Sequence, residues 1–398
     1  MESLADRVRR LEPQRICIIK PSSLGDVVHC LPILPALRVL FPSSQITWVV
    51  NAALRSLLDS HPDLDRVIAF ERGKSGISSR GASATTHLCA RLLREQYDLT
   101  IDLQGLLRSG LMTAATRATV RVGTADAREG ARWFYTHRVP ASRLQLHAVD
   151  RVLRVVAALG LEGFEPSFGI SPGDQNRQWA REILASAPRP RLILNLGARW
   201  LTKRWPPEHF AEIARRAAAE FGAGLVCVGA RADVPLAEAL RVAIAPLPLL
   251  DLSGQTTLLQ LAALARESHL FVSNDTGPLH LAAAAGAAVV GIYTCTNPRL
   301  TGPYGPSATT VQSCVWCAPS FRRTCDRLEC FAELNPDRVW PVVRNRLIRS
   351  LESAASRTTL GATPRSDCNQ SCIEWQRAVE VTSPNNPAPG SVLRQGGN

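Results

Sequence analysis

Short apolar runs alternate with longer amphipathic segments from residue 15 onward. Runs of this kind, rich in β-branched residues, are typical of strands buried in a parallel sheet. Helical patterns lie between several of them, for example at residues 87–95, and a further helix is expected after residue 26, where Pro32 and Pro35 make it less regular. The strands expected in this half are residues 15–20, 45–50, 65–70 and 97–103.

The same alternation restarts after a polar segment at residues 171–176, which we interpret as an interdomain linker. Strands alternating with helices predict βαβ units, so this half should also contain a parallel sheet. The expected strands are residues 191–196, 225–228, 270–272 and 288–293. The expected helices are residues 206–221, 234–242, 257–268, 277–285 and 335–351.

A chain of 398 residues is longer than one hydrophobic core usually supports, so we expect two α/β domains. The first should span residues 1–172 and the second residues 173–352. Residues 353–398 are rich in Ser, Thr, Pro, Asn and Gly, and we expect a disordered tail there. Ligands of open α/β sheets bind beyond the carboxyl ends of the strands, which places the expected site in the cleft between the two halves.

The net charge of +12 draws attention to residues 117–154, which contain eight arginines against three acidic residues. Such a segment suits an anionic surface, a phosphorylated substrate or a nucleic acid, or it forms a solvated helix face. With 6% aromatic residues and no RNA- or DNA-binding motif, nucleic acid is the weakest of these partners.

The first residues are charged and polar, unlike a signal peptide. The longest uncharged apolar run, residues 279–292, is largely Ala and Gly and falls short of the roughly 20 residues of a membrane helix. We therefore expect a cytoplasmic protein whose membrane association, if any, is peripheral.

Residues 21–29 (PSSLGDVVH) connect the first strand to a helix. Ser22, Ser23 and Gly25 offer small side chains and accessible backbone, and Asp26 places a carboxylate at the helix entrance. Asp26 is equally compatible with a helix-start acid that interacts with the helix dipole. No GxGxxG motif follows this strand, which argues against a dinucleotide site.

Residues 273–286 (SNDTGPLHLAAAAG) also join a strand to a helix. Asp275, Thr276 and Gly277 open that helix, where free N–H groups favour a phosphate, and His280 lies one turn further on. The structural alternatives are an ordinary N-cap and a hydrogen-bonded core histidine.

In residues 197–207 (GARWLTKRWPP), Lys203 and Arg204 precede a helix. Cations at this position would neutralise a diphosphate leaving group. A solvated basic loop is the alternative.

Five segments, in order, resemble glycosyltransferase family 9, and most closely its lipopolysaccharide core heptosyltransferases of type I. They are residues 21–29, 102–110 (DLQGLLRSG), 147–155 (HAVDRVLRV), 203–210 (KRWPPEHF) and 274–286. The resemblance runs from about residue 15 to about residue 350. It implies a GT-B fold, in which two Rossmann-like domains with parallel sheets face each other across a cleft.

The resemblance also implies an inverting transfer from ADP-L-glycero-β-D-manno-heptose to a Kdo-bearing lipid A acceptor. Asp26 would be the general base, and Lys203 would contact the donor diphosphate. On the acceptor side we expect Ser22, Ser23 and Gly25 of the loop after the first strand, and the resemblance adds Arg128. On the nucleotide-sugar side it points to Gly197, Ala198, Lys203, Asp233, Asp275, Thr276, Gly277, Pro278 and His280.

Two positions depart from the family pattern. Type I enzymes often carry hydroxyl residues where this chain has Ala198 and Arg199. An acidic residue is expected to hold the adenosine ribose, and Asp233 is the nearest candidate.

An inverting displacement needs one base for the acceptor proton and positive charge for the leaving diphosphate. No Asp-x-Asp sequence stands at the carboxyl end of an expected strand to hold a metal, so we expect a metal-independent enzyme without cofactor. Its partners would be an ADP-sugar donor and an anionic glycolipid acceptor at the inner membrane face, with no nucleic acid and no obligate protein partner. The alternatives are another sugar or acceptor within the family, a nucleotide-sugar epimerase of the same fold, and a non-catalytic binding protein.

Cys314, Cys317, Cys325 and Cys330 lie in one compact segment. Their spacing allows a zinc site but lacks the second CxxC that would make one specific. Reduced thiols without a metal are the alternative for a cytoplasmic protein.

Overall fold

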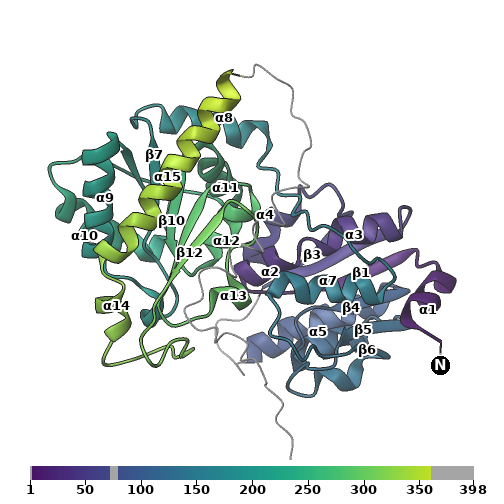
Figure 1. Ribbon diagram of the computed structural model, residues 1–398. Helices are drawn as coiled ribbons and strands as arrows, with labels where there is room; N and C mark the ends of the chain where they lie inside the picture. The colour runs from purple at the N-terminus through teal and green to yellow at the C-terminus, as the bar shows by residue number, and fades with distance from the viewer. Residues whose placement is uncertain (1, 72–78, 360–398) are drawn as a thin grey trace, which may run out of the picture. The chain divides into compact units, whose positions relative to one another are not determined.

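The computed structural model describes residues 2–71 and 79–359, and Figure 1 shows its elements. The part of the described chain up to Ala354 forms one compact unit. Within these residues, no helix has the length and apolar character needed to cross a lipid bilayer.

The first half of this unit contains a six-stranded sheet in which every pair of neighbours is parallel, with the order β3-β2-β1-β4-β5-β6. Alternate residues of β1 face opposite sides: Ile16 and Ile18 pack with α2, α3 and α7, whereas Cys17 and Ile19 pack with α5 and α6. The strands are β1 (Arg15–Ile19), β2 (Gln45–Asn51), β3 (Arg66–Phe70), β4 (Leu99–Asp102), β5 (Val120–Thr124) and β6 (His137–Val139). The helices are α1 (Leu4–Leu11), α2 (Leu24–Cys30), α3 (Ile33–Leu40), α4 (Arg55–Leu58), α5 (Ser79–Arg94), α6 (Leu107–Ala115) and α7 (Ala148–Ala158).

The second half contains another six-stranded parallel sheet, with the order β12-β11-β10-β7-β8-β9. Its strands are β7 (Arg191–Asn195), β8 (Gly224–Val228), β9 (Leu249–Asp251), β10 (Leu270–Asn274), β11 (Val289–Tyr293) and β12 (Ala308–Gln312). Its helices are α8 (Gly173–Leu184), α9 (Pro207–Phe221), α10 (Val234–Ile244), α11 (Leu258–Glu267), α12 (Gly277–Ala284), α13 (Pro298–Thr301), α14 (Glu329–Glu333) and α15 (Pro336–Thr359). Short 3-10 helices include η2 (Ala131–Phe134), η3 (Leu201–Lys203) and η4 (Arg231–Asp233).

These two sheets confirm the predicted α/β architecture and all eight expected strands. Four strands were not expected: β5, β6, β9 and β12. Three of these strands, β6, β9 and β12, lie at sheet edges. Arg121 interrupts β5, and β12 is partly exposed with mostly polar residues, so neither forms a continuous apolar run.

Three expectations were wrong in detail. The helix expected after residue 26 is divided into α2 and α3, because Pro32 lacks an N–H and forms the N-cap of α3. The predicted linker at residues 171–176 is partly helical, since α8 begins at Gly173 directly after Pro172. Asp174 in its first turn is a helix-start signal that the composition of the segment concealed. Residues 353–359, expected to belong to a disordered tail, are helical because α15 continues to Thr359, and the rest of that tail lies outside the described residues.

One hydrophobic cluster extends through both halves. It contains buried side chains from α2 and α7 of the first half and from α11 and α12 of the second half. Within it α2 packs against α12, and Figure 1 shows these two helices side by side. Both helices begin at the carboxyl ends of central strands, so their packing brings the two sequence-predicted loops together.

Candidate active site

Asp26 lies in the first turn of α2, and its carboxylate closes a capping box with Ser23. Oδ2 accepts hydrogen bonds from the Ser23 backbone N–H at 3.0 Å and from the Ser23 hydroxyl at 2.6 Å. Oδ1 has no hydrogen-bond partner among the residues that the structure describes. Asp26 is therefore the helix-start acid that the sequence allowed, and it keeps one oxygen that a substrate hydroxyl can approach.

The charge state of Asp26 is controlled by its neighbours. Although the side chain is open to solvent, dense surroundings raise its pKa. The positive charge of Lys20, the bonds from Ser23 and the charge of His280 lower it by more, so the net pKa of Asp26 lies below its ordinary value. Lys20 is buried at the end of β1 and donates to the carbonyl of Leu103 at 3.1 Å. The carboxylate is thus ionised at neutral pH, as a general base requires.

The second loop places Asp275 at the start of α12. Thr276 is the N-cap of this helix, and Gly277 and Pro278 form its first turn. The Thr276 hydroxyl accepts a hydrogen bond at 3.2 Å from the side-chain amide of Asn195, which ends β7. Pro278 has no N–H, and the N–H groups of Leu279 and His280 donate to the Thr276 carbonyl. Since the Thr276 hydroxyl does not cap the helix, the N–H of Gly277 remains available to an anion.

Asp275 is the centre of a buried polar cluster. Its Oδ2 accepts hydrogen bonds from Lys203 Nζ at 2.5 Å and from the Thr296 hydroxyl at 2.6 Å, and its Oδ1 lies 3.4 Å from His280 Nε2. Burial raises the pKa of Asp275, but the bond to His280 and the charge of Lys203 outweigh it and hold that pKa below its usual range. Asp275 therefore remains a carboxylate that fixes the ammonium beside the helix end.

Lys203 lies at the end of η3, in the loop that follows β7. Its Nζ is 4.7 Å from the centre of the Trp200 ring, and the guanidinium of Arg323 lies 5.4 Å from the same ring. Two cations thus flank one indole beside the N-terminus of α12. This grouping of positive charge suits a diphosphate.

Two glycines permit the close contact between α2 and α12. A Cβ atom on Gly25 would lie 2.7 Å from Cδ2 of His280, and a Cβ atom on Gly277 would lie 2.8 Å from the Leu24 side chain. Because each helix presents a glycine to a side chain of the other, Asp26 and His280 are close enough for the charge of His280 to lower the pKa of Asp26. His280 Nδ1 is buried and has no hydrogen-bond partner within the described chain.

Three histidines meet where the halves touch. His29 of α2 has its ring 4.5 Å from His280 and 5.2 Å from His147, the N-cap of α7. The Nε2 atoms of His29 and His147 lie 3.2 Å and 3.0 Å from the same carbonyl, that of Gly302. Burial lowers the pKa of both rings, and neighbouring histidine charges lower it further. Both are therefore neutral and donate to Gly302 across the contact.

The remaining donor-side predictions gather at the ends of β7 and β8. The Asp233 carboxylate lies against Gly197, where a Cβ atom would be 2.2 Å from Asp233 Oδ2, and it accepts from the Ala230 backbone N–H at 2.9 Å. The Ala198 carbonyl accepts from Arg204 at 2.7 Å, which holds the loop between β7 and Lys203.

On the acceptor side, Ser22 lies in the loop between β1 and α2, next to Ser23. Arg128 lies in the loop after β5, and its backbone N–H donates to the Gly105 carbonyl in the loop after β4. Its exposed side chain has no bond to Asp26 among the described residues. Arg128 and Asp26 thus both lie at the carboxyl ends of strands of the first sheet, but their side chains form no bond with each other.

Sequence reasoning missed Lys20, Thr296 and the pair of His29 and His147. Lys20 carried a signal, because a charged residue ends an otherwise apolar strand. Thr296 gave none, and His29 and His147, although they stand in two of the family-like segments, gave no sign that they meet, since their partners are distant in the sequence.

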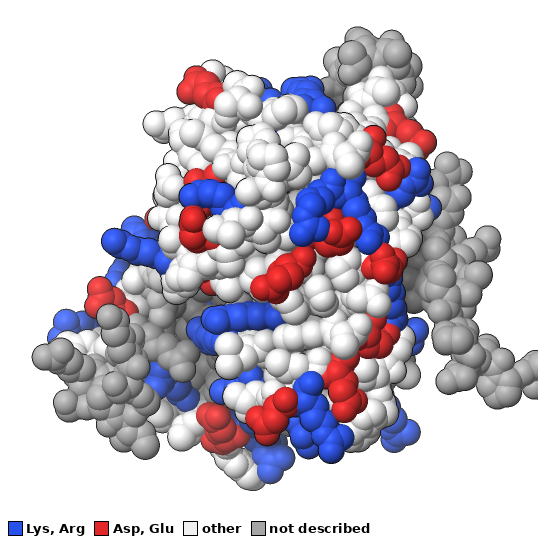
Figure 2. All heavy atoms as spheres, turned by 90° about the vertical axis from the view of Figure 1, so that its left-hand side faces the viewer, with Lys and Arg blue, Asp and Glu red and all other residues white. Residues whose placement is uncertain are grey.

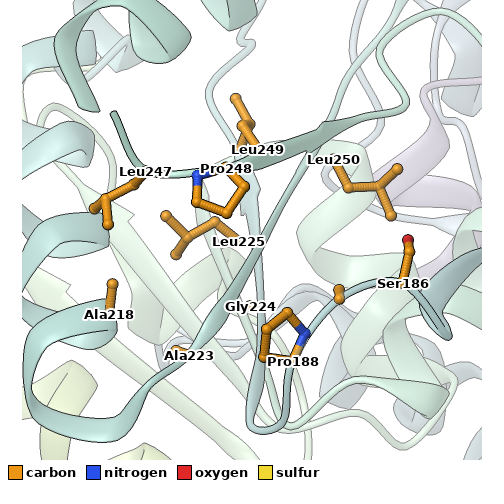
Figure 3. Close-up of a pocket in the computed structure, with 11 residues that line it drawn as sticks. Ser186, Pro188, Ala218, Ala223, Gly224, Leu225, Leu247, Pro248, Leu249 and Leu250 are labelled. Atoms are coloured by element: carbon orange, nitrogen blue, oxygen red, sulfur yellow. The ribbon is translucent and has the colours of Figure 1, made fainter. Parts of the chain in front are cut away.

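An apolar pocket of about 310 Å³ lies elsewhere, at the amino ends of β7, β8 and β9 (Figure 3). Its walls include Pro188, Leu225 and Leu249 and no charged residue. The pocket lies at the amino ends of these strands, whereas Asp275 follows the carboxyl end of β10 in the same sheet. The pocket is therefore not the diphosphate site.

Within residues 2–71 and 79–359, no three side chains of His, Cys, Asp or Glu gather in a way that could hold a metal ion. Cys314, Cys317, Cys325 and Cys330 are free thiols and do not form a four-ligand group in the described chain.

Comparison with known proteins gives consistent matches. The profile of glycosyltransferase family 9 (heptosyltransferase) matches residues 85–330. Lipopolysaccharide heptosyltransferase 1 of Pseudomonas aeruginosa is 32% identical over 352 residues, which are 82% of this chain and 96% of that protein.

Solved structures extend the likeness to the fold. The E. coli heptosyltransferase WaaC, solved with ADP and with ADP-2-deoxy-2-fluoro heptose, is 25% identical with a TM-score of 0.65, covering 83% of this chain and 99% of that one. A family 9 glycosyl transferase of Veillonella parvula has a TM-score of 0.74 at 23% identity, covering 84% and 98%.

Proposed function

Because the chain belongs to glycosyltransferase family 9, the heptosyltransferases, we propose that it transfers heptose from ADP-L-glycero-β-D-manno-heptose to a Kdo-bearing lipid A acceptor of the lipopolysaccharide inner core. One observation supports this most directly. The ionised Asp26 of the first half stands beside the Lys203, Asp275 and His280 cluster of the second half.

In the proposed reaction an acceptor hydroxyl attacks C1 of the donor sugar while Asp26 takes its proton. The new O–C1 bond forms as the bond between C1 and the diphosphate oxygen breaks, and ADP leaves with that electron pair. Attack from the face opposite the leaving group inverts the configuration at C1. The low pKa of Asp26 keeps the base ionised before the reaction.

The leaving diphosphate needs positive charge and hydrogen-bond donors. Lys203 has three N–H groups, of which one is used by Asp275. The others, with the Gly277 N–H at the start of α12, would receive the developing charge on ADP. Since protein groups supply this charge, we propose that transfer needs no metal.

The contacts of the remaining predicted residues agree with a nucleotide site. Asp233 beside Gly197 would hold the adenosine ribose, and Thr276 with the free His280 Nδ1 would hold donor phosphate or sugar groups. Arg128 would bind an anionic group of the acceptor. An acceptor with a lipid anchor would place the protein peripherally on the cytoplasmic face of the inner membrane.

The test is direct. Purified protein is incubated with ADP-heptose and a Kdo-lipid A acceptor, and the product is examined for the mass of one added heptose. ADP-glucose and UDP-sugars replace the donor in parallel reactions. Product from another sugar alone would replace the heptose assignment, and no product from any donor would overturn the transferase proposal.

A further inference from the structure

An exposed tryptophan stands between two arginines in the first half. Trp133 lies in η2 and is 69% exposed. The guanidinium carbons of Arg132 and Arg138 lie 5.1 Å and 5.6 Å from the centre of its ring. Cation–π contacts of this kind hold an indole at the surface without burying it.

Two exposed leucines lie on α6, the helix that packs against η2. Leu107 and Leu111 lie one turn apart on α6 and are 45% and 44% exposed, so they share a helix face. The helix between them packs tightly on η2, since a Cβ atom on Gly110 would lie 2.6 Å from the Phe134 ring and 3.1 Å from Cα of Ala131. We call Leu107, Leu111, Arg132, Trp133 and Arg138 the arginine–tryptophan patch.

The patch carries unneutralised positive charge. Residues 103–139 contain six arginines against two acidic residues. Within the described chain, the ion pairs of the first half join other arginines to carboxylates and leave out Arg132 and Arg138. By contrast, Arg216 pairs with both Glu212 and Asp337 in the second half. Figure 2 shows the face at the left of Figure 1, and on that face positive and negative side chains are interspersed, so the charges there offset one another.

The patch also borders the acceptor side of the site. The Ala131 N–H donates to the Arg128 carbonyl at 3.0 Å, so η2 directly continues the loop after β5. That loop lies at the carboxyl edge of the first sheet, the edge from which Asp26 emerges. A surface bound to this patch would therefore lie next to the position proposed for the acceptor.

We propose that the arginine–tryptophan patch binds the anionic surface of a lipid bilayer. Indole rings favour the interface between water and lipid, and arginines favour anionic headgroups. The two leucines add apolar area that reaches the acyl boundary. This proposal builds on the lipid-anchored acceptor of the proposed function, but its test needs neither donor nor acceptor, so either proposal can fail alone.

The test is co-sedimentation of the full chain with phosphatidylcholine vesicles with and without phosphatidylglycerol. Wild-type protein should bind the anionic vesicles and dissociate from them at high salt, and it should not bind the neutral vesicles. Arg132→Gln with Arg138→Gln should weaken partitioning roughly thirtyfold, since each of the two arginines near an anionic surface contributes about 1 kcal/mol and about 1.4 kcal/mol is a factor of ten. Trp133→Gln should also weaken it several-fold.

Trp316→Gln is the matched control, because Trp316 is 81% exposed and lies in the second half. It should bind as wild type does, and thermal unfolding should show that all variants fold. Equal losses in Trp133→Gln and Trp316→Gln would overturn the proposal. So would wild-type protein that binds neither vesicle or binds both equally. With a soluble, deacylated acceptor the patch variants should retain wild-type transfer rates.

Discussion

The ammonium of Lys203 and the carboxylate of Asp275 form an ion pair, with Nζ 2.5 Å from Oδ2. Both side chains are largely buried, at 18% and 5% exposure. The pair joins the loop after β7 to the N-terminus of α12, two elements of the proposed donor site. The carboxylate therefore orients the cation that is proposed to receive the diphosphate.

Lys203→Ala should impair both transfer and stability. Transfer should fall roughly 100- to 1,000-fold, the usual loss when one donor to a developing anion is removed. Stability should fall by about 3 kcal/mol, because Asp275 would remain buried without its ammonium. Steady-state kinetics and urea unfolding would measure the two effects.

A double variant separates these effects. Lys203→Ala with Asp275→Asn removes the unpaired charge, so it should recover much of the stability while transfer stays low. Recovery of transfer together with stability would show that Lys203 only supports the fold.

Asp26→Asn should reduce the transfer rate by roughly 100- to 10,000-fold, the range for loss of a general base. The amide oxygen can still accept from Ser23, so unfolding should change little. Ser23→Ala is the complementary variant: it should cost about 1 kcal/mol of stability through the lost hydroxyl bond to Asp26, and it should lower transfer far less than Asp26→Asn does. If Asp26→Asn transferred sugar at the wild-type rate, the carboxylate of Asp26 would serve only as a helix cap and would not be the general base.

Gly25→Ala should disturb the contact between α2 and α12, since its Cβ would lie 2.7 Å from His280. Overpacking at such a contact costs about 1–3 kcal/mol, and displacement of His280 from Asp275 should lower the transfer rate as well. Adding His280→Ala should restore stability by making room, without restoring transfer. A thermal midpoint unchanged in Gly25→Ala would show that the two helices separate easily.

Local sequence patterns predicted the parts of the site that lie within one loop. Asp26 and Asp275 each follow a buried strand and open a helix, so their placement required no long-range information. The contact between their two helices could not be predicted locally. It depends on residues distant in the sequence, because Gly25 packs against His280 and Gly277 packs against Leu24. Strands such as β1 and β10 were predictable for a similar reason, since burial on both faces gives a continuous apolar run, whereas β5 is interrupted by Arg121 and β12 is mostly polar.

Transfer should survive a strong chelator. The positive charge at the proposed diphosphate position comes from Lys203 and the α12 N-terminus, so prior treatment with EDTA should leave the rate unchanged. Readdition of Mg²⁺ or Mn²⁺ to the chelated enzyme is the control. A rate that fell with EDTA and returned with either ion would contradict the metal-independent mechanism.

Stability should decline as the pH falls below about 6.5, and His29 should be one cause. Its buried Nε2 faces the Gly302 carbonyl, while His280 and His147 lie beside the ring. Burial and these two histidines lower the pKa of His29 in the folded protein, despite the opposing charge of Asp275. Below the unfolded pKa, the unfolded chain therefore binds a proton that the folded ring does not. The free energy of unfolding then falls by up to about 1.4 kcal/mol per pH unit for each such histidine.

His29→Gln keeps a side-chain N–H for Gly302 but removes this titration. Its free energy of unfolding, measured with urea from pH 7.5 to 5, should therefore fall less steeply than that of wild type. Some slope should persist, because burial also lowers the pKa of His147. His87→Gln, which replaces an exposed histidine of α5, is the matched control and should follow wild type. Parallel curves for wild type and His29→Gln would mean that His29 takes up its proton equally well in the folded protein, contrary to the buried, neutral ring inferred at the contact between the halves.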